Sequence, residues 1–180
     1  MGRNSMTVSA AEKFTVISSS GQAPWSSLSN LEYGNSGAAT STLSPFLINT
    51  GNLFCAIPNF ITAIPTGSEF ESLKVTFSDK MDSSYSAEGY CWLTGGTVLS
   101  SGTIGTSYAA RSKDGDASFW GLAGTPQSIF SGLKSGSIKF SFQALGGIYS
   151  AGDVYVKDVV ATLTYKLADT KRAAILIALP

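Results

Sequence analysis

Apolar and polar residues alternate along several short stretches of this chain. In residues 73–78 and again in residues 138–143, every second residue is apolar and the residues between are polar. A period of two places one set of side chains in a core and the other in water, which is typical of a β-strand with one buried face. In the longest β-prone stretch, 154–165, the alternation shifts and predicts a β-bulge around Lys157 and Asp158.

Further short β-prone segments are separated by turns rich in glycine, proline and serine; they lie at residues 14–17, 60–67, 85–93 and 97–100. The pattern predicts an all-β fold, an antiparallel β-sandwich or jelly roll of about seven to nine strands. One short helical turn is expected near Thr125–Phe130, because Thr125 can cap it and Pro126 suits its first position.

The ends of the chain differ in composition from the middle. Residues 1–13 are polar and small and are expected to form a flexible arm, residues 14–168 the sandwich, and residues 169–180 an apolar tail. The tail is too short to span a membrane, which takes about 20 apolar residues, so no membrane partner is expected. It can pack on its own sandwich or add a strand to a neighbouring subunit. The residues expected to make contacts between subunits are Met6, Val8, Ile175, Leu176, Ile177 and Leu179.

The composition excludes several kinds of chemistry. The 180 residues include no histidine, which excludes a serine–histidine or cysteine–histidine nucleophile and a histidine-ligated zinc ion. Charged residues make up 13%, with 12 basic and 12 acidic, so that the net charge is zero. A groove for nucleic acid needs an excess of cations. We therefore expect no nucleic-acid partner, no metal and no cofactor.

The residues that could still carry chemistry are few. Cys55 and Cys91 are too few for a closed zinc site and are expected to be buried free thiols, although a disulfide stays open. Residues 113–116 place two carboxylates around a glycine without the further ligands of a calcium loop, which indicates a surface turn. Asp79 and Asp82 are likewise expected in a solvated loop.

The three tryptophans can serve a core or a sugar-binding groove. Burial is the commoner fate of tryptophan in a β-sandwich, so Trp92 and Trp120 are expected in the core. Trp25 lies in a polar stretch, and its place stays open.

Three stretches, taken in order, resemble a family of small virion proteins of tailed bacteriophages. The likeness covers roughly residues 25–166 and rests on residues 60–68 with Leu73–Val75, on Phe119–Gly121 with Thr125–Ile129, and on Val154–Val159 with Leu163–Tyr165. The resemblance implies a structural β-sandwich that decorates or cements the outside of phage heads, or belongs to tail and fibre assemblies, often as a trimer.

The resemblance leads to one main expectation and one alternative. The main expectation is a non-enzymatic capsid decoration protein on the outer surface of the virion head, where it binds the major capsid protein and its own copies as a homo-oligomer, a trimer. The alternative is a tail or head-fibre domain that binds host-surface carbohydrate; its candidate residues are Trp25, Tyr85, Tyr90 and Tyr108. A polysaccharide hydrolase would need two paired carboxylates, and nothing in the sequence selects a pair.

Overall fold

The chain forms two antiparallel β-sheets that pack face to face. The structure is a computed structural model and describes residues 7–13, 15–32, 36–46, 49–56 and 64–167. Its strands within these residues are β1 (Thr7–Lys13), β2 (Thr15–Ser20), β3 (Ala39–Leu43), β4 (Asn52–Ala56), β5 (Glu69–Met81), β6 (Ala87–Leu93), β7 (Leu99–Ile104), β8 (Ala109–Gly115), β9 (Phe140–Gly146) and β10 (Gly152–Lys166). A 3₁₀-helix, η1 (Leu28–Leu31), and an α-helix, α1 (Pro126–Ser135), complete the list.

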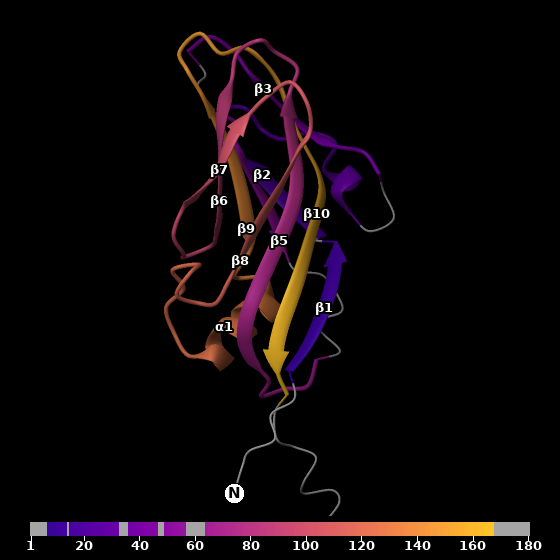
Figure 1. Ribbon diagram of the computed structural model, residues 1–180, viewed down its shortest axis with the longest axis vertical. Helices are drawn as coiled ribbons and strands as arrows, with labels where there is room; N and C mark the ends of the chain where they lie inside the picture. Colours follow the sequence, from indigo (N-terminus) through magenta and orange to yellow (C-terminus); the bar gives the residue numbers. More distant parts are fainter. Residues whose placement is uncertain (1–6, 14, 33–35, 47–48, 57–63, 168–180) are drawn as a thin grey trace, which may run out of the picture.

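Each sheet has five strands within the described residues. Sheet A has the order β1-β10-β5-β8, and β3 pairs with the first part of β10. Sheet B has the order β2-β4-β9-β6-β7. In Figure 1, β1, β10 and β5 of sheet A lie in front of β9 and β6 of sheet B. The fold is therefore the antiparallel β-sandwich that the alternating pattern predicts.

The core lies between the sheets and is built from the alternating apolar residues. Leu73, Val75 and Phe77 of β5 point inward and are at most 2% exposed. The ring of Phe77 packs between those of Phe140 and Phe142 of β9, with centroids 5.7 and 5.3 Å away. Burying an aromatic side chain of this kind contributes about 1.5–3 kcal/mol, so these rings join the two sheets.

Helix α1 closes one end of the sandwich (Figure 1). It begins as predicted: Thr125 Oγ1 accepts a hydrogen bond from the Ser128 amide at 3.1 Å, and Pro126 takes the first position. It runs further than the sequence predicted and ends at Ser135, followed by the cap residue Gly136, whose φ of +74° is the left-handed conformation that glycine adopts most readily. Its inward side chains are Ile129, Phe130 and Leu133.

Two further predictions are confirmed. The register between β10 and β5 shifts between Lys157 and Val160, and Asp158 has a φ of +54°, which together form the predicted bulge. Trp120 is fully buried, and its Nε1 donates to the Leu73 carbonyl at 3.0 Å.

Other predictions about the elements are wrong. Strand β8 was missed because its residues are mostly polar and it lies at the edge of sheet A. Residues 113–116, expected as a turn, include the end of this strand. The expected N-terminal arm is partly a strand, because β1 pairs with residues 160–166 of β10, and Val8 lies opposite Tyr165. Met6 and the tail residues Ile175, Leu176, Ile177 and Leu179 lie outside the described residues.

Candidate functional site

Aromatic side chains gather on the outer face of sheet B. In β6, Cys91 and Leu93 are fully buried and point toward sheet A. Because successive residues of a strand face opposite sides, Tyr90 and Trp92 point outward, where both are half-buried. Phe54 of β4 has the same orientation, since its neighbours Leu53 and Cys55 are buried.

The strand register brings these aromatic residues together. Ser141 of β9 lies opposite Trp92 on one side and opposite Phe54 on the other. Two strand spacings therefore separate Trp92 from Phe54, about 10 Å. Ser141 is fully buried although it is on an outer face, and its Oγ has no hydrogen-bond partner among the described residues. The flanking side chains thus cover the middle of the sheet.

Uncharged polar groups lie next to the aromatic ones. Gln143 is opposite Tyr90, and its Nε2 donates to the Thr50 carbonyl at 3.0 Å, which holds the amide in place. Asn52, two residues before Phe54 on the same side of β4, has a buried Oδ1 that has no partner within the described part of the chain. We call this set the aromatic face; its members are Phe54, Tyr90 and Trp92 with Asn52, Ser141 and Gln143.

Charged groups occur at the two ends of the aromatic face. Toward one end, Glu88 accepts hydrogen bonds from Ser100 Oγ at 2.6 Å and Thr103 Oγ1 at 3.2 Å. Toward the other end, Lys139 and Phe54 line a hollow of about 220 Å³ together with Ser18, Thr94, Gly136 and Ser137. The Glu88 carboxylate is thus held by two hydroxyls of β7. The members of the aromatic face, which lie between Glu88 and Lys139, are all uncharged.

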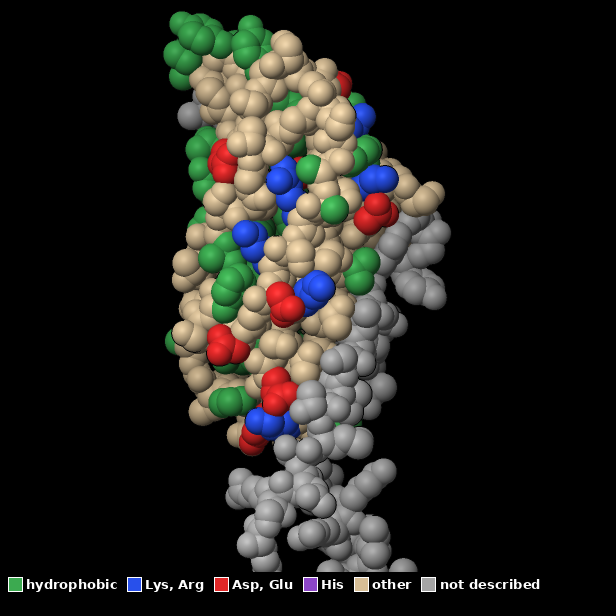
Figure 2. Space-filling view, viewed as in Figure 1, with side chains coloured by type: hydrophobic (Ala, Val, Ile, Leu, Met, Phe, Trp, Pro, Cys, Tyr) green, Lys and Arg blue, Asp and Glu red, His purple; other side chains and the backbone are tan. Residues whose placement is uncertain are grey.

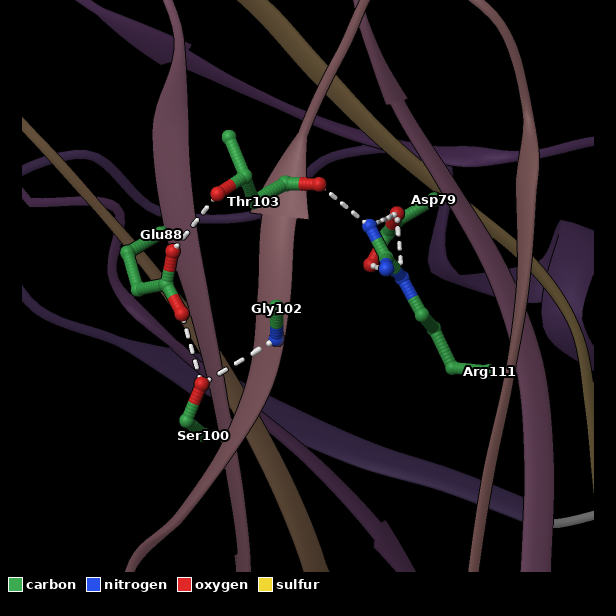
Figure 3. A network of polar contacts seen from close by, with 6 residues as sticks. All are labelled: Asp79, Glu88, Ser100, Gly102, Thr103 and Arg111. Atoms are coloured by element: carbon green, nitrogen blue, oxygen red, sulfur yellow. Dashed lines mark hydrogen bonds and ion pairs between the residues drawn. The ribbon is translucent and has the colours of Figure 1, made fainter.

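A buried ion pair supports β7, the strand whose hydroxyls donate hydrogen bonds to Glu88 of β6. Arg111 donates to Asp79 through Nε (3.1 Å) and Nη2 (2.9 Å), and Nη2 also donates to the Thr103 carbonyl at 2.6 Å. Figure 3 shows Thr103 between the two groups, with its hydroxyl toward Glu88 and its carbonyl toward Arg111. The prediction of a solvated loop for Asp79 is wrong: it lies in β5 with 0% exposure, and burial raises its pKa while Arg111 opposes that rise.

The side chains predicted to bind carbohydrate lie in different parts of the structure. Tyr90 is on the aromatic face, whereas Tyr85 lies in the loop before β6. Trp25 is 4% exposed and donates its Nε1 to the Gly51 carbonyl at 2.6 Å, so it belongs to the core. Tyr108 precedes β8, and the ammonium of Lys157 lies 4.4 Å from its ring centroid.

The prediction of a core position for Trp92 is wrong. It occupies an outward position of β6, whereas Trp120 and Trp25 fill the interior. Phe54 and Gln143 were not singled out in the sequence. Residues 90–93 are all apolar or aromatic, so the sequence does not show which of the two alternating sets of side chains meets the second sheet.

The outer side of sheet A has a different character. Strands β5, β8 and β10 bear lysines and carboxylates there, and Figure 2 shows basic and acidic side chains interspersed over the view in which these strands lie in front. Residues in this set are Lys74, Lys80, Asp114, Lys157 and Asp158. The aromatic face of sheet B is therefore the less charged of the two outer surfaces.

The thiols are not placed for nucleophilic chemistry. Cys55 and Cys91 are buried and free, as predicted, and burial raises their pKa values to about 12 and about 11. Among the described residues, no group of three or more cysteine, aspartate or glutamate side chains could hold a metal ion. Within the same residues, no helix is long and apolar enough to cross a membrane.

No protein-family model matches the chain, and no curated protein sequence matches it. Among solved structures, the chain is similar to a family 29 carbohydrate-binding module from Piromyces equi (TM-score 0.40, 8% identity, 87% of this chain and 90% of the other). It is also similar to a xylan-binding domain from Paenibacillus barcinonensis (TM-score 0.41, 8% identity, 91% and 97%) and to a cellulose-binding domain from Cellulomonas fimi (TM-score 0.36, 7% identity, 89% and 88%).

Proposed function

We propose that this protein is a non-enzymatic carbohydrate-binding domain and that a saccharide chain binds across the aromatic face of sheet B. The observation that carries the proposal is the outward, half-buried position of Trp92 beside Tyr90, with Phe54 on the far side of Ser141. A pyranose ring has an apolar C–H surface and a rim of hydroxyls. It therefore fits a site of aromatic rings with a few fixed polar groups.

The polar groups of the aromatic face suit hydroxyl partners. The Gln143 amide is held by the Thr50 carbonyl, whereas the Asn52 Oδ1 is buried beneath the surface. An amide that is already oriented loses little side-chain entropy when a ligand hydroxyl binds to it. The Gln143 amide can therefore supply hydrogen bonds while the rings supply stacking.

The distribution of charge favours a neutral ligand. Glu88 and Lys139 lie toward opposite ends of the face, and no charged side chain belongs to its central set. An anionic polymer would meet the Glu88 carboxylate without a matching row of cations. A neutral saccharide chain avoids this cost and can extend over several strands.

The test is binding of the full chain to soluble neutral polysaccharides, measured by retardation in native gels that contain hydroxyethylcellulose, xylan, mannan or dextran. We expect retardation by at least one polymer, and Trp92→Ala should weaken binding by about thirtyfold, the effect of losing a 2 kcal/mol anchor. The matched control is Tyr108→Ala, which removes an exposed tyrosine outside the aromatic face and should leave binding unchanged. Full binding by Trp92→Ala, or no retardation by any polymer, would contradict the proposal.

The resemblance to phage virion proteins suggests where such a domain would act. In a tail or head fibre, the aromatic face would recognise host-surface carbohydrate, and no catalytic step would be required. Adsorption of fluorescently labelled protein to host cells, with and without Trp92→Ala, measures this role directly.

Capsid decoration is the second candidate, and one observation favours it. Strand β1 is the first strand in the described part of the chain and lies at the edge of sheet A, paired to β10. An edge strand can be exchanged between identical subunits, which would link copies into the expected trimer. Removing residues 1–13 should then convert an oligomer to a monomer in light scattering and abolish retention on purified heads. A monomeric full-length chain would contradict this candidate.

A further inference from the structure

Three loops bring large apolar side chains to the end of the sandwich opposite helix α1. Phe46 follows β3, Tyr85 lies between β5 and β6, and Ile148 and Tyr149 lie between β9 and β10. Their exposed fractions are 83%, 52%, 53% and 67%, in that order. Figure 2 shows hydrophobic side chains gathered at the upper end of the molecule. Such a concentration of exposed aromatic surface on loops is characteristic of a binding site.

Two of these loops, the one with Tyr85 and the one with Tyr149, border an open hollow of about 400 Å³. We call it the loop pocket; it is lined by Tyr85, Ser86, Gly147, Ile148, Tyr149 and Ser150. The two tyrosines come from loops that are 64 residues apart in the sequence. The lining contains no charged side chain and combines two phenol rings with serine hydroxyls and peptide groups.

The walls of the loop pocket are fixed by hydrogen bonds among the loops. Ser150 is 4% exposed; its Oγ accepts from the Gly147 amide at 2.9 Å and donates to the Ser86 carbonyl at 3.4 Å. The Ser150 amide in turn donates to the Gly147 carbonyl at 2.8 Å, and the Phe46 amide donates to the Ile148 carbonyl at 3.2 Å. A pocket held in this way exists before its ligand arrives, which reduces the entropy lost on binding.

We propose that the loop pocket is a second carbohydrate site, which takes one or two sugar residues of a neutral saccharide. Its volume is within the range of small-molecule sites, roughly 300–1,000 Å³. The phenol rings of Tyr85 and Tyr149 offer stacking surfaces, and the hydroxyls and peptide groups of the walls offer hydrogen bonds to sugar hydroxyls. No cation is among the lining residues to attract an anionic ligand.

The loop pocket is separate from the aromatic face but adjoins the same sheet. Ala87 and Gly146 are opposite each other at the ends of β6 and β9, and Ser86 and Gly147 of the pocket are their next neighbours. Trp92 lies six residues after Ser86 along β6, a distance of about 20 Å. One sugar cannot contact both sites, so the loop pocket does not depend on the proposed function of the aromatic face. A longer chain that reached both would bind with the avidity of two linked sites.

The experiment is a nuclear magnetic resonance titration of the ¹⁵N-labelled full chain with glucose, galactose, mannose and N-acetylglucosamine and with their disaccharides. For at least one sugar we expect saturable shifts of the Ser86, Gly147 and Tyr149 amides. Tyr85→Ala and Tyr149→Ala should each weaken this sugar about tenfold, the loss of one aromatic contact of about 1.4 kcal/mol. Both side chains are more than half exposed, so the variants should keep the wild-type melting temperature.

Controls separate the loop pocket from the aromatic face. Trp92→Ala should leave the small-sugar shifts unchanged although it weakens polysaccharide binding, and Tyr108→Ala should affect neither measurement. Absence of saturable shifts at the pocket with every sugar would overturn the proposal. It would also be overturned if the pocket residues shifted only with protein concentration, or only with phosphatidylcholine vesicles, since a second copy or a lipid surface would then be the occupant.

Discussion

Replacing Arg111 by methionine should test the buried ion pair that supports the Glu88 side of sheet B. Methionine keeps much of the apolar stem but removes every hydrogen bond that the guanidinium donates to Asp79 and to the Thr103 carbonyl. Asp79 is 0% exposed, and 17% of the Arg111 side chain is exposed. The variant therefore leaves a carboxylate in the sandwich without a counter-charge.

The expected loss is large because the remaining charge stays buried. Breaking a buried ion pair by removing one partner costs about 3–5 kcal/mol. For a domain of this size, about 1 kcal/mol corresponds to about 2–4 °C in the melting temperature, so Arg111→Met should melt on the order of 10 °C below the wild type. The control Lys74→Met removes an exposed cation of the neighbouring strand β5 and should change the free energy of unfolding by no more than about 0.5 kcal/mol.

The stability that Arg111→Met loses relative to the wild type should depend on pH. Burial already raises the pKa of Asp79, and without Arg111 to oppose that rise the pKa of this carboxyl should increase further. When the pKa of a carboxyl is higher in the folded state than in the unfolded state, its protonation stabilises the folded protein. This stabilisation is complete below the pKa of the unfolded carboxyl, about 3.9. It is lost as the pH rises through the pKa that Asp79 has in the folded variant. The gap between variant and wild type should therefore be widest at neutral pH and should narrow on acidification.

Urea unfolding followed by tryptophan fluorescence at pH 7 and near pH 4 measures both effects, because Trp25 and Trp120 are buried. The double variant Asp79→Leu, Arg111→Met removes both charges and should recover most of the lost stability. A loss below about 1 kcal/mol at neutral pH, or an equal loss at both pH values, would refute the reasoning from burial.

Three further variants or reactions test other parts of the fold. Thr125→Ala removes the cap that accepts from the Ser128 amide and should lower the free energy of unfolding by about 1 kcal/mol, whereas Thr125→Ser should keep it. Phe77→Ala leaves a cavity between the two sheets and should cost about 3–5 kcal/mol in the same urea assay. Cys55 and Cys91, with pKa values of about 12 and about 11, should not react with a disulfide reagent at pH 8 in the folded protein and should react fully in guanidinium chloride; rapid labelling of the native protein would show that the sites open.

The sequence predicted the features that depend on local chemistry. Alternation in residues 73–78 predicted a half-buried strand, the threonine–proline pair at 125–126 predicted the start of α1, and the shift of pattern near Lys157 predicted the bulge. Each of these features depends on neighbours within a few residues. Backbone geometry makes side chains alternate between the two faces of a strand, and nearby side chains supply hydrogen bonds to the unpaired amides at the start of a helix.

Strand β8 and Asp79 show where local pattern was insufficient. Residues 109–115 are polar enough to resemble a loop, and they form a strand because β5 offers an unpaired edge for hydrogen bonding. Asp79 occupies an inward position of β5, and it is tolerated there because Arg111 reaches it from β8. Both outcomes depend on the partner strand rather than on the segment itself.

The sequence by itself determined that the chain is an all-β sandwich with few charged residues, no net charge and 11% aromatic residues. Only the tertiary structure decided which aromatic residues meet the second sheet and which meet solvent: Trp25 and Trp120 fill the core, and Trp92 faces outward. Alternation shows that a strand has two faces, but packing of the second layer selects the buried one. In the same way, only folding brings Tyr85 and Tyr149 to one pocket, because loop ends distant in sequence meet where their strands end together.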